Sequence, residues 1–494
     1  MANSVAKSLF LTPLRFMWKG AVFLFNGKIL RREEGAEFDK RWSYSKYLNS
    51  RNTGLLLDGD HLKLSSSESF QNVCCIARVG AGKTSRYIIP NVLERSKHTC
   101  SIVVNDPKGE VFEATSKHLE SRGFNVVVID PENITHSSCF NPLLESRNSI
   151  ELEQIAEILV KSGSGGSDKD SIWENGAIRF VSVFLQCLKN AERDNPAFNT
   201  LANLYYLFQN FGSDGEALDS WMARYTIDPN DPSDKRLWNE WKGLLTGNDE
   251  GVQSFVLNAI TALKAMSNKN LAQLTSRSDF SLEEIRQKKT IIYVITPPQL
   301  MSYYSFLISL FFRSVFNACM RELPSKRTLP VYVLYDEFGH STIPNFVETA
   351  NTIRAYKISL SIVLQSISQL SSKYGKDDAN SVLGGFASYL CYAGSDPETA
   401  SFFERIIGRT RIIQRPDVFD HNTEQYREQN LINANEVRTM KDSEVLIVTK
   451  NRLPVQVNSK GFYQLGKFKR LVRKGSADLP SVTPPTLQYI VLDS

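Results

Sequence analysis

One octapeptide constrains the fold of this chain more than any other feature of its sequence. Residues 77–84 read Ala-Arg-Val-Gly-Ala-Gly-Lys-Thr, and they lie between a short apolar run and a segment with helical spacing. In a phosphate-binding loop the glycines let backbone N–H groups close around phosphate oxygens, and the start of the next helix adds a partial positive charge. The first position is usually glycine, so Ala77 has to tolerate any backbone strain there. The octapeptide predicts a strand, a phosphate-binding turn and a helix; a glycine-rich turn without nucleotide is the lesser alternative.

Each side chain of this loop has an expected task. Lys83 is expected to reach the β- and γ-phosphates of bound ATP, and Thr84 to place its hydroxyl on Mg²⁺. The residues expected to surround the nucleotide are Gly80, Ala81, Gly82, Lys83, Thr84 and Ser85.

A second apolar run, residues 330–335, ends in the adjacent acids Asp336 and Glu337. Acids at the carboxyl end of a parallel strand face the crevice in which ligands bind to open α/β sheets. Asp336 is then expected to orient Mg²⁺, and Glu337 to polarise an attacking water. Taken alone, such a pair is more often a solvated strand end. The phosphate-binding loop around Lys83 reverses that preference.

Two further polar residues stand where a nucleotide site needs them. Gln365 ends the apolar run 359–364, in position to hydrogen-bond a γ-phosphate or its water, and a polar strand cap is an equal alternative. Arg354 precedes the same run and is expected to enter a neighbouring subunit's site as an arginine finger. Its alternative is a surface arginine at a helix end. The arginines that compete for the finger role are Arg405, Arg409 and Arg411, and the sequence does not decide between them.

From residue 72 onward, runs rich in β-branched residues alternate with helical stretches, the pattern of a mostly parallel sheet with helices on its faces. Residues 150–285 break this pattern, because they lack strong strand runs and show helical spacing after the flexible tract Ser162–Ser167. We therefore expect an α/β nucleotide-binding domain with an inserted all-α domain. The predicted strands are Asn72–Ile76, Ser101–Asn105, Asn125–Ile129, Thr290–Ile295, Val331–Tyr335, Ser359–Leu364 and Ala387–Tyr392.

The chain of 494 residues is long enough for two or three domains. The nucleotide-binding domain is expected to take residues 61–149 and 286–455, with the all-α domain at 150–285 between its two parts. Residues 1–60 are expected to form a basic amphipathic N-terminal segment, and residues 456–494 a basic C-terminal tail.

The partners of the two basic ends stay open. The first thirty or so residues contain no apolar run of about 18 uncharged residues, so a membrane-spanning helix is poorly supported. A segment that lies on an anionic membrane surface or docks on a membrane partner, and a helix packed on the body, are equal alternatives. The C-terminal patch suits phosphate backbones or anionic lipid, and a solvated basic face is at least as good an account. Its members are Lys460, Lys467, Lys469, Arg470, Arg473 and Lys474.

Composition excludes several classes. Hydrophobic residues make up 42% and charged residues 22%, which argues against collagen-like, coiled-coil and wholly disordered chains. The net charge of +5 is too small over this length to indicate nucleic-acid binding by itself. Seven cysteines without a CxxC pair indicate reduced thiols, and six histidines without HExxH spacing indicate no metal site other than nucleotide-bound Mg²⁺.

Ordered motifs from about residue 70 to about residue 450 resemble a known family. Between the two nucleotide motifs come Asn105-Asp-Pro-Lys-Gly-Glu110, then Gly123 to Pro131, then Phe140-Asn-Pro-Leu143. In this order and spacing the chain resembles the type IV secretion coupling ATPases of bacterial conjugation, the TraG/TraD class. The later landmarks are Asp336-Glu-Phe338, Ile353-Arg-Ala-Tyr356, Leu364-Gln-Ser-Ile-Ser-Gln-Leu370, and Gly384 to Gly394 leading into Glu398-Thr-Ala400.

The resemblance implies a RecA-like motor domain that carries an all-α domain and assembles as a ring, usually a hexamer, on the cytoplasmic face of the bacterial inner membrane. Such proteins couple ATP hydrolysis to the movement of single-stranded DNA, with its attached relaxase, toward a secretion channel. By motif position, Lys83, Thr84, Asp336, Glu337, Gln365 and Arg354 take the roles given above. Family members commonly begin with two transmembrane helices. The basic segment before Glu33 implies either a peripheral contact or a separate membrane anchor protein.

Two alternatives to a coupling ATPase stay open. A HerA- or FtsK-like pump of double-stranded DNA shares the motor chemistry, but not the landmarks at 106–110 and 140–142. A non-hydrolysing adaptor would use the helical domain to recruit protein substrates, with nucleotide only stabilising the ring. The presence of Glu337 argues against the adaptor.

Overall fold

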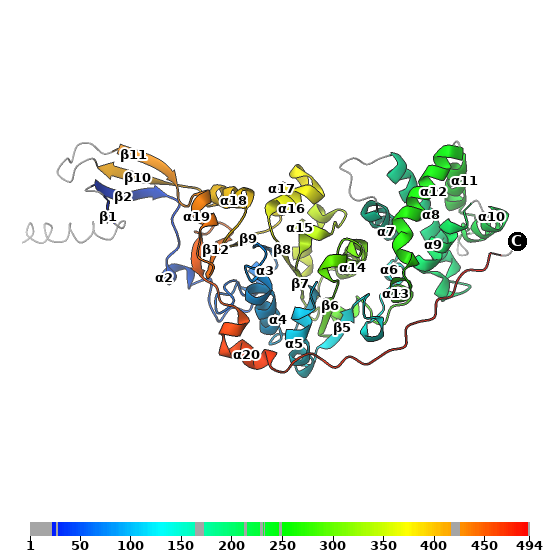
Figure 1. Cartoon of the computed structure of the whole chain (residues 1–494), viewed down its shortest axis with the longest axis horizontal. Helices are drawn as coiled ribbons and strands as arrows, with labels where there is room; N and C mark the ends of the chain where they lie inside the picture. The colour runs from blue at the N-terminus through cyan, green and yellow to red at the C-terminus, as the bar shows by residue number, and fades with distance from the viewer. Residues whose placement is uncertain are drawn as a thin grey trace, which may run out of the picture.

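A sheet of nine strands forms the centre of the molecule, in the order β13-β12-β9-β3-β8-β7-β4-β6-β5 (Figure 1). The computed structural model describes residues 22–25, 28–163, 172–211, 215–227, 231, 233–246, 249–415 and 425–492. Seven strands from β9 to β5 run parallel, and β12 and β13 extend the sheet by antiparallel pairing. The strands are β3 (Val73–Ile76), β4 (Ser101–Asn105), β5 (Asn125–Ile129), β6 (Thr290–Val294), β7 (Val331–Tyr335), β8 (Ile358–Leu364), β9 (Ser388–Tyr392), β12 (Glu444–Thr449) and β13 (Val455–Asn458).

The seven predicted strands are all confirmed, with ends that differ from the prediction by at most one residue. They were recognisable because parallel strands covered on both faces read as continuous apolar runs, and β3, β4, β6, β7 and β8 are buried along their whole length. The hairpin of β12 and β13 was not predicted. Its signal was the apolar run from Val445 to Val448, rich in β-branched residues, ahead of Pro454.

Helices cover both faces of this sheet, and two apolar clusters fill the space between. The side chains of β3 alternate, since Cys74 and Ile76 belong to one cluster while Val73 and Cys75 belong to the other. This is the predicted α/β class. One face carries α4 (Ile89–Arg95), α5 (Glu110–Ser121) and α20 (Gly466–Val472); the other carries α14 (Ser305–Met320), α15 (Phe346–Thr352), α16 (Ile367–Tyr374), α17 (Lys376–Gly384), α18 (Pro397–Ile407) and α19 (Ala434–Arg438).

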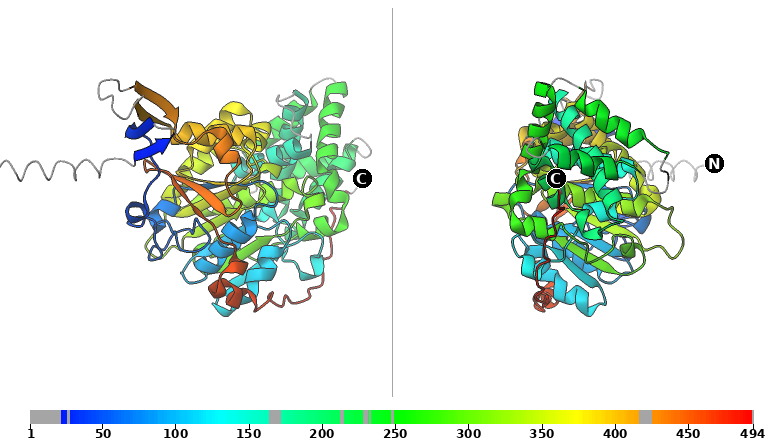
Figure 2. Two further views of the ribbon diagram at one scale, coloured as in Figure 1. Left: turned by 60° about the vertical axis from the view of Figure 1, so that its left-hand side comes forward. Right: turned by 90° about the vertical axis from the view of Figure 1, so that its right-hand side faces the viewer.

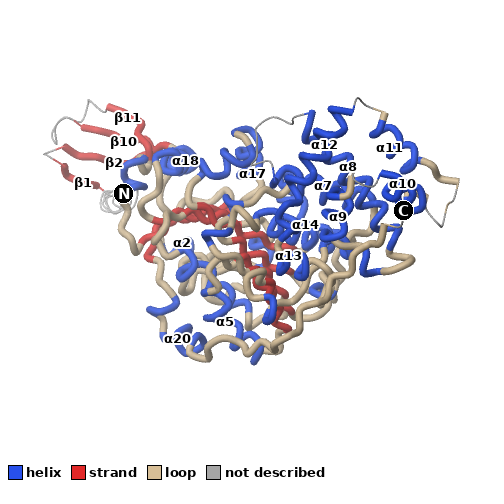
Figure 3. The backbone as a smooth tube through the Cα atoms, turned by 45° about the vertical axis from the view of Figure 1, so that its right-hand side comes forward, coloured by secondary structure: helices blue, strands red, loops and turns tan. Residues whose placement is uncertain are grey.

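A group of helices lies between β5 and β6 in the chain and stands at one end of the molecule (Figure 3). Aromatic rings hold its centre, with Phe184 in contact with both Phe208 and Trp241 at centroid distances of 4.5 and 5.6 Å. The predicted tract Ser162–Ser167 begins in the last turn of α7 and continues outside the described residues. These helices are α6 (Pro142–Glu145), α7 (Ser149–Gly163), α8 (Ile172–Ala191), α9 (Leu201–Gln209), α10 (Gly215–Tyr225), α11 (Arg236–Leu245), α12 (Asp249–Leu263) and α13 (Lys269–Leu274).

A small antiparallel sheet, in the order β1-β2-β10-β11, projects from the opposite end (Figures 1 and 2). It joins β1 (Val22–Phe25) and β2 (Lys28–Gly35) to β10 (Arg409–Arg415) and β11 (Gln425–Asn430). The alternative of an N-terminal helix packed on the body is therefore wrong for residues 22–25 and 28–35, because β1 pairs with β2 and β2 pairs with β10. Residues 1–21, 26 and 27 of the predicted membrane-surface segment lie outside the described residues.

The segment that precedes the main sheet in the chain also packs on the body. Leu48 and Leu55 are buried in the apolar cluster beneath α4, with α2 (Arg41–Tyr44) and α3 (Ser66–Ser69) close by in the chain. Within the described residues, we find no helix with the length and apolar character that a membrane crossing requires. All seven cysteines are buried free thiols.

After α20 the C-terminal tail crosses the molecule in an extended path to the helical end (Figure 1). The backbone N–H of Val482 donates to the Thr135 carbonyl at 2.8 Å, and the Gln273 amide donates to the Pro485 carbonyl at 2.8 Å. Ile490 is buried against the helices, with its N–H on the Asn203 side chain at 3.0 Å. The tail thus ties the sheet to the helical end.

Candidate functional site

Four polar turns meet at the carboxyl edge of the parallel strands. The octapeptide follows β3, Gln365 follows β8, the Asp336–Glu337 pair follows β7, and Asp106 follows β4. Because β3, β8, β7 and β4 are consecutive in the sheet, these turns are neighbours in space. A ligand at this edge would lie in the usual binding crevice of an open α/β sheet.

The octapeptide forms the turn that its glycines predict. Gly80 and Gly82 have φ values of +82° and +80°, in the left-handed region that favours glycine. Ala77 continues the strand, with its N–H on the Leu364 carbonyl at 3.0 Å, and it is not among the residues with positive φ. A Cβ at that first position therefore carries no left-handed strain. The Ser85 hydroxyl donates to the Gly82 carbonyl at 3.1 Å and closes the turn.

Lys83 lies at the bottom of this turn with only 8% of its surface exposed. Its ammonium contacts Glu337 Oε1 at 2.5 Å and lies 3.9 Å from Asp336 Oδ1. A buried cation needs such partners. The two predicted motifs, 254 residues apart in the chain, thus meet through an ion pair.

Thr84 and Asp336 also meet, and their geometry fits a shared magnesium ion. The Thr84 hydroxyl donates to Asp336 Oδ2 at 2.9 Å. Adjacent oxygen ligands of an octahedral Mg²⁺, each at 2.0–2.1 Å from the metal, lie roughly 3 Å apart. The hydroxyl and the carboxylate are therefore spaced as two ligands of one ion. The Asn105 amide fixes the Asp336 backbone by donating to its carbonyl at 2.7 Å.

Glu337 is held in a conformation that few residues of its type adopt. Its φ of +55° lies in the left-handed region, a strain of order 1–3 kcal/mol that functional sites often carry. The Gln365 amide donates to Glu337 Oε2 at 2.7 Å, which brings the fifth predicted residue into the cluster. His340 Nε2 lies 3.7 Å from the same oxygen. We did not predict His340, although its spacing of three residues from Glu337 on one turn was a signal for it.

Burial changes the acidity of two carboxyls at this edge. It raises the pKa of Asp336 to about 6, against the opposing effect of Lys83 and with some help from the neighbouring Glu337. It also raises the pKa of Asp106 to about 7, although Asp106 accepts a hydrogen bond from the Phe112 N–H at 2.8 Å. Asp106 was named in the sequence only as part of a motif, and its burial was not predictable from it.

The raised pKa of Asp336 leads to a testable pH dependence. An unfolded aspartate releases its proton near 3.8, whereas folded Asp336 holds it to about 6, so stability falls as pH rises through that window. The shift corresponds to roughly 3 kcal/mol. Asp336→Asn is expected to flatten this dependence in urea-unfolding midpoints measured from about pH 4 to about pH 7. The exposed Asp442→Asn is the matched control; equal pH profiles for all three proteins would contradict the assignment.

Arg354 is not part of this cluster. It lies in the single turn Ile353–Tyr356 before β8, at the opposite edge of the sheet from Gln365, and it is exposed. Its competitor Arg405 lies over the ring of Phe402 at 5.9 Å, and Arg409 and Arg411 are in β10 of the small sheet. The structure therefore brings together Lys83, Thr84, Asp336, Glu337 and Gln365, and it leaves the arginines outside.

Comparison with known protein families gives a match over most of the chain. Residues 39–482 match the family described as type IV secretory system conjugative DNA transfer. The chain belongs to this family. The predicted family relationship is thereby confirmed over most of the chain.

Individual relatives agree with this membership. Protein VirD4 of Rhizobium radiobacter is 27% identical over 430 residues, which cover 83% of this chain and 59% of VirD4. The chain thus spans less than two thirds of that curated relative. Among solved structures, the unbound bacterial conjugative coupling protein TrwBdeltaN70 has a TM-score of 0.70 at 14% identity, covering 88% of this chain and 96% of that one. The plasmid coupling protein TrwB in complex with ADP and Mg²⁺ has a TM-score of 0.68 at 14% identity, covering 89% and 97%. These structures share the fold.

Proposed function

We propose that this member of the conjugative DNA transfer family is an ATP-driven coupling protein. It recruits DNA, with an attached relaxase or protein substrate, and moves it to a type IV secretion channel. The observation that carries the proposal is the cluster in which Lys83 meets Glu337 while Thr84 meets Asp336. A nucleotide site of this kind is the part of a motor that family membership alone does not guarantee.

ATP and Mg²⁺ are the proposed ligands of the cluster. The backbone N–H groups of residues 80–85 surround the phosphates, and the Lys83 ammonium contacts the β- and γ-phosphates. Thr84 and Asp336 hold Mg²⁺, which supplies charge neutralisation for the phosphate oxygens when it is bound. The related TrwB, solved with ADP and Mg²⁺, supports this ligand pair.

We expect the ion pair between Lys83 and Glu337 to open when nucleotide binds. The Glu337 carboxylate, whose Oε1 lies 2.5 Å from the ammonium, and an entering γ-phosphate are both anionic and compete for the same cation. When Lys83 moves to the phosphate, Glu337 Oε1 becomes free to accept a proton from the attacking water. Gln365 keeps the other carboxylate oxygen in place through its 2.7 Å hydrogen bond, so Glu337 retains its orientation during the exchange.

The proposed partners follow from the same function. They are single-stranded DNA with its relaxosome, the proteins of the secretion channel, and a separate membrane anchor protein. The working form is a homo-oligomeric, hexameric ring on the cytoplasmic face of the bacterial inner membrane. The exposed position of Arg354, away from its own site, supports a role for this residue in a neighbour's site.

Hydrolysis per subunit is expected to rise severalfold with protein concentration, or on addition of single-stranded DNA, because assembly completes each site with an arginine from a neighbour. Arg354→Ala should remove this rise and Arg405→Ala should leave it, in phosphate-release assays paired with sedimentation measurements. Turnover per subunit that stays flat across the assembly transition would argue against a shared site. Binding of ATP with no turnover, even with DNA present, would favour the non-hydrolysing adaptor instead.

A further inference from the structure

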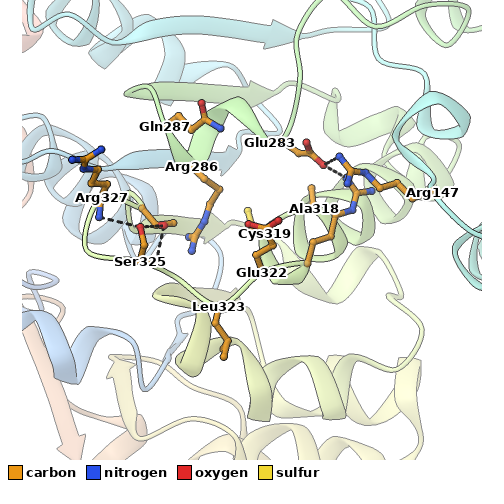
Figure 4. A pocket seen from close by; sticks show the side chains of 12 residues that line it. Arg147, Glu283, Arg286, Gln287, Ala318, Cys319, Glu322, Leu323, Ser325 and Arg327 are labelled. Atoms are coloured by element: carbon orange, nitrogen blue, oxygen red, sulfur yellow. Dashed lines mark hydrogen bonds and ion pairs between the residues drawn. The ribbon is translucent and has the colours of Figure 1, made fainter.

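A cavity of about 500 Å³ opens at the edge of the sheet where the parallel strands begin, opposite the nucleotide site (Figure 4). Arg286 and Gln287 line it from the turn before β6, and Arg147 lines it from the segment before α7. The loop between α14 and β7 contributes Arg321, Glu322, Leu323, Ser325, Arg327 and Thr328. Four of its lining residues are arginines: Arg147, Arg286, Arg321 and Arg327.

Arg286 forms the floor of this cavity and lacks a counter-ion. It is 8% exposed, and Nη2 donates to the Tyr356 carbonyl at 2.6 Å. Its Nη1 is buried without a hydrogen-bond partner, and no carboxylate of the described residues forms an ion pair with it. Burial lowers the pKa of this guanidinium. Buried charges are ordinarily paired, so an anion is the missing partner.

The other charges around the cavity leave a positive balance. Arg147 and Arg321 both pair with Glu283, and Arg321 also lies 3.3 Å from Glu151. Arg327, which lines the cavity, and its chain neighbour Lys326 are both exposed and form no ion pair with any described residue. Glu322 is the one lining acid without an ion-pair partner in the described part of the chain, and it is exposed as well.

Neutral donors complete the lining. The hydroxyls of Ser325 and Thr328 lie 3.0 Å apart, and Gln287 is a further lining residue (Figure 4). The figure shows the Arg286 side chain pointing into the cavity between the Ser325 loop and Cys319 at the end of α14. A planar guanidinium that can form two parallel hydrogen bonds suits a phosphate group well.

We propose that this cavity binds the phosphate backbone of single-stranded DNA, with Arg286 at its floor, and with Arg327 and the adjacent exposed Lys326 on the loop that borders it. The inference rests on the proposed function and places a DNA contact on the side of the sheet away from ATP. One phosphate enters to meet Arg286, and the next phosphates along the strand meet the exposed cations. Glu322 opposes binding, so it limits the affinity of the site.

The test uses the full chain and a fluorescent thirty-nucleotide oligo(dT), with anisotropy measured over a range of salt concentrations. Removing two phosphate contacts in Lys326→Ala/Arg327→Ala should lower the slope of log affinity against log salt by about 1.4, which is about tenfold in affinity at physiological salt. Arg286→Met should cost roughly fourfold by the same relation. Glu322→Gln should raise the affinity for oligo(dT). A variant that had merely lost its fold would show a lower affinity, so this result separates the two.

Matched measurements separate the alternatives. Lys264→Ala/Lys269→Ala removes the same charge from two exposed lysines at the helical end and should leave affinity unchanged; an equal loss there would overturn the proposal. Affinity unchanged in Lys326→Ala/Arg327→Ala, or lost only toward vesicles of anionic phospholipid, would overturn it while leaving the motor intact. ATP turnover without DNA should persist in that variant. If Arg286→Met fails a melting control, the affinities of Lys326→Ala/Arg327→Ala and Glu322→Gln decide whether the proposal holds. No oligo(dT) binding by the unaltered chain would overturn the proposed function as well.

Discussion

Lys83→Ala is expected to lower ATP turnover by at least about a hundredfold while the protein remains folded. The ammonium is the group expected to stabilise charge on the β- and γ-phosphates, and within the described residues it is the cation that forms ion pairs with Asp336 and Glu337. Nucleotide affinity should fall as well, because the Glu337 carboxylate would then face the phosphates without the lysine between them.

Folding should survive this change because the site can adjust its protonation. Without Lys83, the pKa of buried Asp336, already about 6, rises further and its carboxyl becomes neutral, so no unpaired charge stays buried. Lys373→Ala on α16 removes an exposed cation outside the cluster and is the matched control. Phosphate release and thermal melting measured on both variants check the expectation; turnover at the unaltered rate in Lys83→Ala would end the motor proposal.

The central sheet and five residues of the site were predictable because both depend on local pattern. Fully buried parallel strands need apolar runs, and the carboxyl ends of neighbouring parallel strands lie at one edge. Polar residues directly after β3, β7 and β8 therefore had to meet once the strands were placed. Lys83 and Glu337 are in contact for this reason, although 254 residues separate them.

Other features depend on contacts between distant segments of the chain, which no local sequence pattern indicates. The strand β2 forms because β10, more than 370 residues later, supplies its backbone hydrogen bonds, as in the pairing of Arg31 with Ile413. Arg286 reads in the sequence as an ordinary helix-end cation, and only the packing of three separate segments around it makes it buried and unpaired. The path of the C-terminal tail to Ile490 likewise depends on contacts with the helical end.

Glu337→Gln is expected to separate nucleotide binding from hydrolysis. The glutamine cannot accept a proton from water, so turnover should fall by roughly 10²- to 10⁴-fold, the usual contribution of a general base. Nucleotide affinity should rise, because Lys83 no longer forms an ion pair that the phosphates must displace. The two site variants thus move affinity in opposite directions while both strongly lower turnover.

That opposition distinguishes a catalytic base from a residue that only holds Lys83 in place. If Glu337 served only as a partner of Lys83, the glutamine would free the lysine for the phosphates and turnover would persist or increase. Titration of a fluorescent ATP analogue, together with single-turnover hydrolysis, measures both quantities on one sample. His340→Gln is the matched control, since His340 approaches the same carboxylate only to 3.7 Å and its loss should change turnover far less. Near-normal turnover in Glu337→Gln would move the base to another group and leave Gln365, which contacts Glu337 Oε2 at 2.7 Å, as the next residue to test.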